Sequence, residues 1–163
     1  MGGETHIRLG KRLRRREKFV TRPMIYQHAT DDFEAYLLDA RDRLDTPSRN
    51  VAYTATDGVF RAFRARLDIQ QALDFANTLP AVLRAIFVQD WVVTPPQPWG
   101  SRAEWTREAK SLRQHHNFSP DTVVADVAWA VRRHVEEGAF DAALARLPHQ
   151  ARDFWDPTPT LRT

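Results

Sequence analysis

Two arginines stand at matching places in a motif that occurs twice in the chain. Arg84 and Arg152 each follow a Leu-Pro pair, four residues after the proline, and they lie 68 positions apart. A guanidinium keeps its charge and presents a planar set of donors, so the two together could bind an anion or an acidic partner. Alternatively, each arginine pairs with an acid or a backbone carbonyl of its own repeat. We favour this second interpretation, because a duplicated unit preserves structural roles in both copies, whereas a site needs only one.

A basic segment at the start of the sequence is the second candidate binding feature. Residues 1–22 hold eight Lys and Arg against two Glu, whereas the rest of the chain is slightly acidic. Such a run can bind nucleic acid or an acidic membrane electrostatically. The candidate nucleic-acid contacts are Lys11, Arg12, Arg14, Arg15, Arg16 and Lys18. Two other interpretations stay open: residues 1–23 form an inert disordered arm, or Met24 is the natural initiator and the arm lies upstream of the true start.

The remaining polar side chains form no recognisable catalytic set. His115 and His116 are adjacent, and neighbours on a helix point in different directions, so they rarely bind one metal together. His134 borders an apolar stripe, and Glu136-Glu137 lie at an expected helix end, where neighbouring acids are usually solvated. The sequence has no Cys and no phosphate loop or nucleophile elbow. We therefore expect no catalytic residue, no metal site and no cofactor, and we favour a protein that is not an enzyme.

Composition indicates a packed globular protein. The chain has 163 residues, of which 42% are hydrophobic, including five Trp and nine Phe, enough for one domain or for two small halves that share a core. No apolar run approaches the roughly 20 residues of a membrane helix, and the basic amino end lacks the apolar stretch of a secretory signal. The lack of Cys fits a reducing compartment. We expect a soluble, cytoplasmic protein.

Apolar residues recur at helical spacing through most of the chain. The predicted helices cover 31–44, 46–67, 68–79 and 80–87 in the first half, and 101–112, 119–138, 138–147 and 147–155 in the second. Their expected starts are an Asp31/Glu34 capping box, Thr46-Pro47, an Asp68/Gln71 box, Pro80, a Ser101/Glu104 box and Ser119-Pro120. Gly138 is expected to end a helix, and Gly58 to mark a close helix contact or a kink.

The two sets of helices look like copies of one unit. Corresponding positions lie 73 residues apart at the caps of the second helices and 68 apart further on, so the second copy of that helix is about five residues shorter. We predict an all-α fold in which tandem duplicated units of about four helices each pack pseudo-symmetrically into one bundle. The expected divisions are a basic arm (1–23), repeat 1 (24–93), a Pro-rich linker (94–100), repeat 2 (101–156) and a frayed tail (157–163).

Three tryptophans bracket the linker between the repeats: Trp91, Trp99 and Trp105. Exposed together, they would form a box on which a ligand could stack. We favour the alternative that they clamp the linker onto both repeats, because large aromatic side chains contribute mainly through burial.

Several short segments carry a resemblance to a known family. They are Ala52-Tyr53, the two Leu-Pro elements, Asp90-Trp91 and the stretch 133–138. From about Phe33 to Trp155 the chain resembles the bacterial domain of unknown function 2267 (DUF 2267) family. The resemblance implies two tandem helical units, and it brings no activity, cofactor or site residue. Family members begin close to the position of Met24, which favours the late-start interpretation, and this sequence departs from them at Gly58 and in its basic extension.

The residues leave three functional hypotheses. The leading one is a non-enzymatic interaction or regulatory module with an unknown protein partner. The second is a nucleic-acid-binding accessory protein that uses the basic arm. The third is an enzyme or ligand binder with a site between the repeats, which a deep pocket near Trp91, Arg84 and Arg152 would favour.

Overall fold

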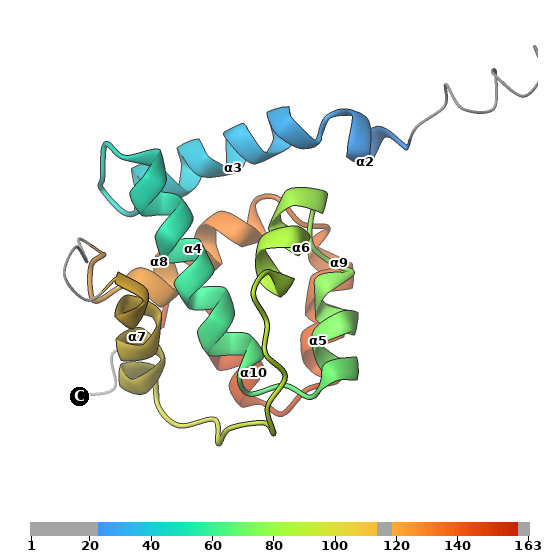
Figure 1. The fold of residues 1–163 in the computed structure, drawn as a ribbon, viewed down its shortest axis with the longest axis vertical. Helices are drawn as coiled ribbons and strands as arrows, with labels where there is room; N and C mark the ends of the chain where they lie inside the picture. Colours follow the sequence, from blue (N-terminus) through green and yellow to red (C-terminus); the bar gives the residue numbers. More distant parts are fainter. Residues whose placement is uncertain (1–22, 114–118, 160–163) are drawn as a thin grey trace, which may run out of the picture.

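The computed structural model describes residues 23–113 and 119–159, and within these ranges all regular structure is helical (Figure 1). The elements are α2 (Met24–Gln27), α3 (Ala29–Arg43), α4 (Arg49–Arg64), α5 (Ile69–Ala76), α6 (Ala81–Val88), α7 (Arg102–Lys110), the 3₁₀ turn η1 (Ser111–Arg113), α8 (Val123–Arg132), α9 (Glu137–Ala145) and α10 (Gln150–Phe154). The prediction of an all-α fold is confirmed. None of the described helices combines the length and the apolar character needed to cross a membrane.

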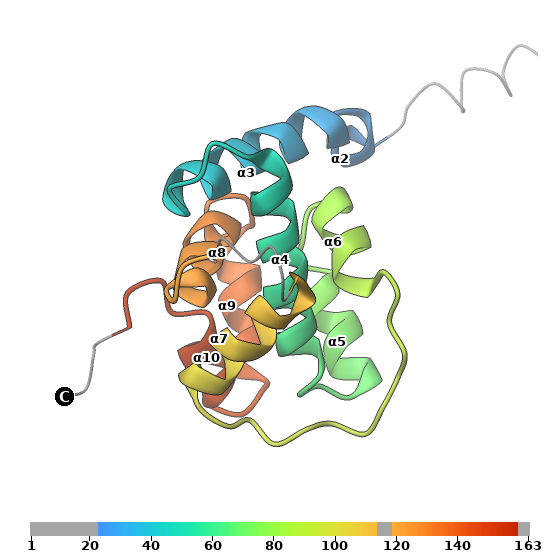
Figure 2. The ribbon, with the colours of Figure 1, turned by 60° about the vertical axis from the view of Figure 1, so that its left-hand side comes forward.

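Helix α4 runs through the middle of the molecule and contacts α3, α6, α7 and α8 (Figure 2). Its fully buried Phe63 touches Phe75 of α5, with 4.7 Å between ring centroids, and Phe154 of α10, at 5.0 Å. Trp155, also fully buried, lies 5.4 Å from the rings of both Phe63 and Phe75. The halves of the chain therefore share one aromatic core. The pseudo-symmetric duplication itself stays a prediction.

Helix α3 lies across the start of α4 and against α8 (Figure 1). Tyr36, Leu37 and Ala40 form its buried face, and Phe33 is half-buried. Because these residues recur at three- and four-residue spacing, one side of the helix meets the core while the other is solvated. This placement also turns the first turns of α3 toward α6 and the end of α8.

Two predicted capping boxes are present. The side chains of Asp68 and Ser101 each accept a hydrogen bond from the N–H three residues later, and Gln71 and Glu104 reciprocate. The box predicted at Asp31 is wrong, because α3 begins earlier, at Ala29, and places Asp31 inside the first turn.

The Pro-containing helix starts are shifted by a few residues from the prediction. Ser48 rather than Thr46 caps α4, and its hydroxyl accepts a hydrogen bond from the Val51 N–H at 3.2 Å. Helix α8 begins at Val123, three residues after the expected Pro120. A proline biases the residue before it toward extended backbone, so these prolines lie in the approach to each helix rather than in its first turn.

Gly138 begins a helix instead of ending one, which corrects the sequence prediction. It lies in the first turn of α9, where its N–H donates to a carboxylate oxygen of Glu136 at 3.1 Å. The sequence offers no Ser, Thr, Asp or Asn at this start, and the cap is a glutamate, which a search for the usual capping residues overlooks. Helix α8 ends earlier, and its 10 residues against 16 in α4 agree with the expected shortening.

The linker is fixed to α4 and α7. The Gln97 N–H donates to the Ala65 carbonyl at 2.8 Å, and the Trp105 indole donates to the Trp99 carbonyl. Trp105 is 3% exposed, and Trp91 and Trp99 pack partly buried against the core. This burial agrees with tryptophans that clamp the linker, and it removes Trp105 from any exposed stacking box.

Candidate functional site

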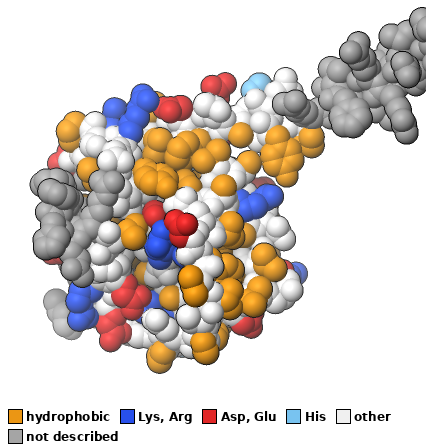
Figure 3. Space-filling model, viewed as in Figure 1, with side chains coloured by type: hydrophobic (Ala, Val, Ile, Leu, Met, Phe, Trp, Pro, Cys, Tyr) orange, Lys and Arg blue, Asp and Glu red, His pale blue; other side chains and the backbone are white. Residues whose placement is uncertain are grey.

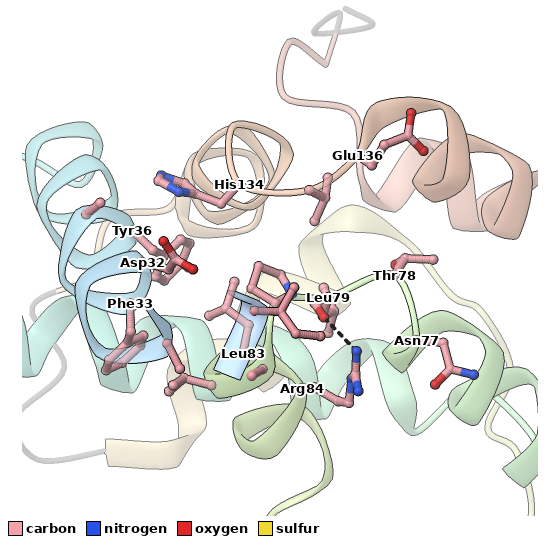
Figure 4. Close-up of a pocket in the computed structure, with 17 residues that line it drawn as sticks. Asp32, Phe33, Tyr36, Asn77, Thr78, Leu79, Leu83, Arg84, His134 and Glu136 are labelled. Atoms are coloured by element: carbon pink, nitrogen blue, oxygen red, sulfur yellow. Dashed lines mark hydrogen bonds between the residues drawn. The ribbon is translucent and has the colours of Figure 1, made fainter. Parts of the chain in front are cut away.

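A cleft of about 470 Å³ opens between α3, the start of α6 and the segment that joins α8 to α9 (Figure 4). Residues 77–84 line one side of it, residues 134–136 line another, and Ile25 of α2 adds an apolar side chain. The cleft therefore joins elements assigned to different halves of the chain. A pocket near Trp91, Arg84 and Arg152 would favour a site between the repeats, and of these three residues Arg84 alone lines this cleft.

One face of α3 supplies the third side of the cleft. Ala29, Asp32, Phe33 and Tyr36 all line it, and their three- and four-residue spacing stacks them along one side of the helix. Burial increases along this face, from the exposed Asp32 through the half-buried Phe33 to the fully buried Tyr36. Asp32 and Tyr36 lie across the cleft from Leu83 (Figure 4). The cleft is thus polar at its opening and apolar at its base.

The Arg84 side chain donates hydrogen bonds to nearby backbone carbonyls. Its Nε donates to the carbonyl of Ala76 at 3.2 Å, and Nη2 donates to the carbonyl of Leu79 at 3.3 Å (Figure 4). Ala76 is the last residue of α5, and the carbonyls of a helix's last turn lack partners within the helix. Arg84 therefore pairs with carbonyls of its own repeat, which is the structural role that the sequence favoured.

Arg152 has no matching arrangement. It lies exposed on α10, and its side chain makes no hydrogen bond or ion pair with the residues that the structure describes. The structure does not bring Arg84 and Arg152 together in the cleft. A shared contact of the two arginines with an anion or acidic partner stays a prediction.

His134 connects the end of α8 to α3. Its Nε2 lies 2.7 Å from a carboxylate oxygen of Asp39, and the Arg133 guanidinium donates to the same oxygen at 3.2 Å. The imidazole also meets the Tyr36 ring edge-on, with 5.7 Å between centroids. His134 lines the cleft half-buried, so it lies at the boundary between core and solvent, as its position beside the apolar stripe indicated.

Asp39→Asn is expected to lower the free energy of unfolding more at pH 5 than at pH 3. Partial burial opposes ionisation of Asp39, but the hydrogen bonds and positive charge of His134 and Arg133 outweigh it and lower the pKa below its ordinary 3.8. A carboxylate with a lowered folded-state pKa stabilises the protein above its unfolded pKa, and that stabilisation is lost as the pH falls through the folded pKa. Urea unfolding of both proteins at the two pH values measures it. An equal difference at both would contradict it.

Tyr36 is held by a buried chain of hydrogen bonds. Its hydroxyl lies 2.6 Å from the Thr56 hydroxyl, which in turn donates to the Ala52 carbonyl at 2.8 Å. Complete burial raises the pKa of Tyr36 far above its usual range, although the hydrogen bond to Thr56 opposes the effect. Tyr36 is thus a neutral, fixed anchor between α3 and α4 rather than an acid or base for chemistry at neutral pH.

Two further polar side chains of the cleft, those of Thr78 and Glu136, are also bonded to backbone. The Thr78 hydroxyl donates to the Phe75 carbonyl at 2.7 Å, and Glu136 accepts the N–H groups of Gly138 and Ala139 as the cap of α9. The lining contains no Ser, Cys or Lys, and no group of three or more His, Asp or Glu among the described residues could hold a metal ion. The arrangement is suited to holding a ligand between apolar walls.

Part of the predicted set cannot be placed. The six basic residues of the arm, Lys11, Arg12, Arg14, Arg15, Arg16 and Lys18, lie outside the described residues, as do His115 and His116. The sequence analysis in turn missed Asp32, Tyr36 and Asp39. A usable signal existed for Tyr36, since it stands three residues after Phe33 on the apolar side of α3. Asp39 offered none, because its partner His134 is 95 positions away.

Comparison with known proteins identifies a family. The model of a family described as "Uncharacterized conserved protein (DUF2267)" matches residues 33–154, which is most of the chain and includes α4 to α10 and all of α3 after its first four residues. Among curated proteins, none matches the sequence.

Proposed function

The chain belongs to the DUF2267 family, and we propose that it is a non-enzymatic interaction module whose cleft binds a short segment of a partner protein. The cleft between α3, α6 and residues 134–136 carries this proposal. Its base is apolar and its position between the two halves of the chain gives it walls from several helices. A partner segment could anchor one large apolar side chain there, as many protein interfaces do with a buried central residue.

Exposed apolar side chains beside the cleft support this proposal. Met24, Ile25 and Tyr26 of α2 are 64%, 52% and 54% exposed, and Ile25 also lines the cleft. In the space-filling view, hydrophobic side chains gather at the end of the molecule where α2 lies (Figure 3). Contiguous apolar surface is a common mark of an interaction site. A segment seated in the cleft would cover part of this surface.

The polar groups of the cleft favour binding over catalysis. Arg84, Thr78 and Glu136 satisfy backbone groups, and Tyr36 is buried and neutral. A general acid or base needs a group that can reach substrate and exchange a proton near the working pH. The hydrogen bonds of these side chains instead keep the shape of the cleft fixed, which reduces the entropy lost when a ligand binds.

Filling the cleft should weaken peptide binding. Random 12-residue peptides displayed on phage would be selected against the full chain, and selected peptides synthesised and measured by fluorescence anisotropy. Ala29→Trp places an indole in the cleft from the first residue of α3, where the native side chain is half-buried. We expect affinity to fall at least about tenfold, because tenfold corresponds to losing only about 1.4 kcal/mol of anchor contacts.

Thr30→Trp is the matched control. Thr30 is the next residue of α3, is exposed and does not line the cleft, so the same indole should leave peptide affinity unchanged. Failure to select any peptide, or equal affinity for Ala29→Trp and wild type, would refute the proposed function.

A small molecule is the second candidate occupant. The volume of about 470 Å³ falls within the roughly 300–1,000 Å³ of typical small-ligand sites, which supports the hypothesis of a ligand binder between the repeats. Fragments that raise the melting temperature of wild type and Thr30→Trp but not of Ala29→Trp would favour this candidate. The nucleic-acid alternative depends on the basic arm, outside the described residues, and stays a prediction.

A further inference from the structure

Asp32 differs from the other charged side chains of the cleft. Its carboxylate lines the cleft but makes no hydrogen bond or ion pair with any residue in 23–113 or 119–159. The others are engaged: Arg84 by carbonyls, Glu136 by the N–H groups of α9, and His134 by Asp39. The charged group still available to a ligand is therefore an acceptor with a negative charge, and its natural complement is a cationic donor.

We propose that the partner segment carries a Lys or Arg next to its apolar anchor and that this cation pairs with Asp32. The inference rests on the proposed function, because it describes the segment that the cleft would hold. Charge complementarity carries it. A basic residue would pair with the one charged group of the cleft that has no partner among the described residues, whereas an acidic residue would approach the negative charges of Asp32 and Glu136.

The surroundings of Asp32 suit a long basic side chain. Phe33 is the next residue, half-buried, and stacks on Tyr36 with 6.4 Å between ring centroids. Ala29 and Ile25 extend the apolar surface toward the opening of the cleft. The methylene stem of Lys or Arg packs on such surface while its charged end stays near water. An anchor at the base of the cleft and a cation at Asp32 could thus come from neighbouring residues of one segment.

Asp32 also has a structural role that a test must separate from binding. It lies in the first turn of α3, where negative charge interacts favourably with the helix dipole. Asp31 occupies the same turn, is also exposed and does not line the cleft. The pair therefore offers matched variants: Asp31→Asn and Asp32→Asn should weaken the helix start alike, and differ in their effect on a ligand in the cleft.

The test uses peptides selected on the full chain and shown to lose affinity on Ala29→Trp. We expect Lys or Arg to be enriched beside the apolar anchor. Changing that basic residue to Gln should weaken binding to wild type about threefold to fivefold, the upper part of the range for a solvent-accessible ion pair. Asp32→Asn should weaken the basic peptide by the same factor and leave the Gln peptide unaffected, whereas Asp31→Asn should change neither.

The outcomes separate this inference from the function on which it rests. Peptides that depend on the cleft but show no preference for Lys or Arg, or that bind Asp32→Asn as well as wild type, would overturn the inference and leave the binding cleft standing. An equal loss for Asp31→Asn and Asp32→Asn would assign the effect to the helix start and also overturn it. If no peptide is sensitive to Ala29→Trp, both proposals fail.

Discussion

Replacing Gly58 by alanine is expected to destabilise the protein by at least about 2 kcal/mol. A Cβ at this position would lie 2.2 Å from the carbonyl oxygen of Ala109 and 3.0 Å from its carbonyl carbon. Both are backbone atoms of α7, so no side-chain rotation can relieve the overlap and the two helices would have to separate. That separation would disturb Trp105 and Ala109, which are buried between α7 and the core. Urea denaturation followed by far-ultraviolet circular dichroism measures the loss.

Gly138→Ala provides the matched control. Gly138 is also helical, but the nearest atom to its added Cβ is a carboxylate oxygen of Glu136 at 3.0 Å, the end of a side chain that can move. Helix propensity alone favours alanine at both positions by about 1 kcal/mol. We therefore expect Gly138→Ala to stay within about 1 kcal/mol of wild type. Similar effects of the two substitutions would mean that Gly58 is not needed for the α4–α7 contact.

The parts of the fold that the sequence predicts well depend on local interactions. The boxes at Asp68 and Ser101 use residues three apart, and the buried faces of α3 and α4 follow helical spacing. The wrong predictions also concern local structure, but they involve residue types that are common at more than one position of a helix. Asp31 fits a cap as well as the first turn, and Gly138 fits an end as well as a beginning. Composition alone does not choose between these positions.

The cleft could not be predicted, because its groups come together only through tertiary packing. Asp39 and His134 meet across 95 positions, and residues 77–84 and 134–136 line one cleft although they are far apart in the sequence. A search for motifs finds residues that share a short segment. Such a search finds Arg84, because it stands in a motif that occurs twice. It does not find Asp32, which stands out only because its side chain has no partner among the described residues.

Several arginines in the described part of the chain share a structural task. The Arg64 guanidinium donates to the carbonyls of Phe87 and Gln89, both at 2.9 Å, and the Arg132 guanidinium donates to the Trp155 carbonyl at 2.8 Å. Arg84 does the same for α5. Carbonyls at helix ends and in extended connections lack regular backbone partners, and a guanidinium can satisfy more than one. These positive charges are therefore used inside the fold rather than displayed to an anionic partner.

Arg66 donates to backbone carbonyls in the same way and also pairs with a carboxylate. Arg66→Met is expected to lower the free energy of unfolding by about 3–5 kcal/mol. Its side chain is 2% exposed. It donates to both carboxylate oxygens of Glu108 at 2.7 and 2.9 Å, to the Ala62 carbonyl at 2.6 Å and to the Trp99 carbonyl at 2.7 Å. Methionine fills similar space but leaves these acceptors without their donor. Chemical denaturation of the variant measures the cost.

Two comparisons identify the source of that cost. Arg49→Met makes the same change at the first residue of α4, where the arginine is 55% exposed and its pair with Glu34 is solvated, so the expected loss is below about 1 kcal/mol. Glu108→Gln should lower the free energy of unfolding less than Arg66→Met does. The Glu108 side chain is 40% exposed, so water can replace its contact, and Arg66 still donates to the Ala62 and Trp99 carbonyls in this variant. If Arg66→Met and Arg49→Met have equal effects, Arg66 does not hold the linker and α7 to α4.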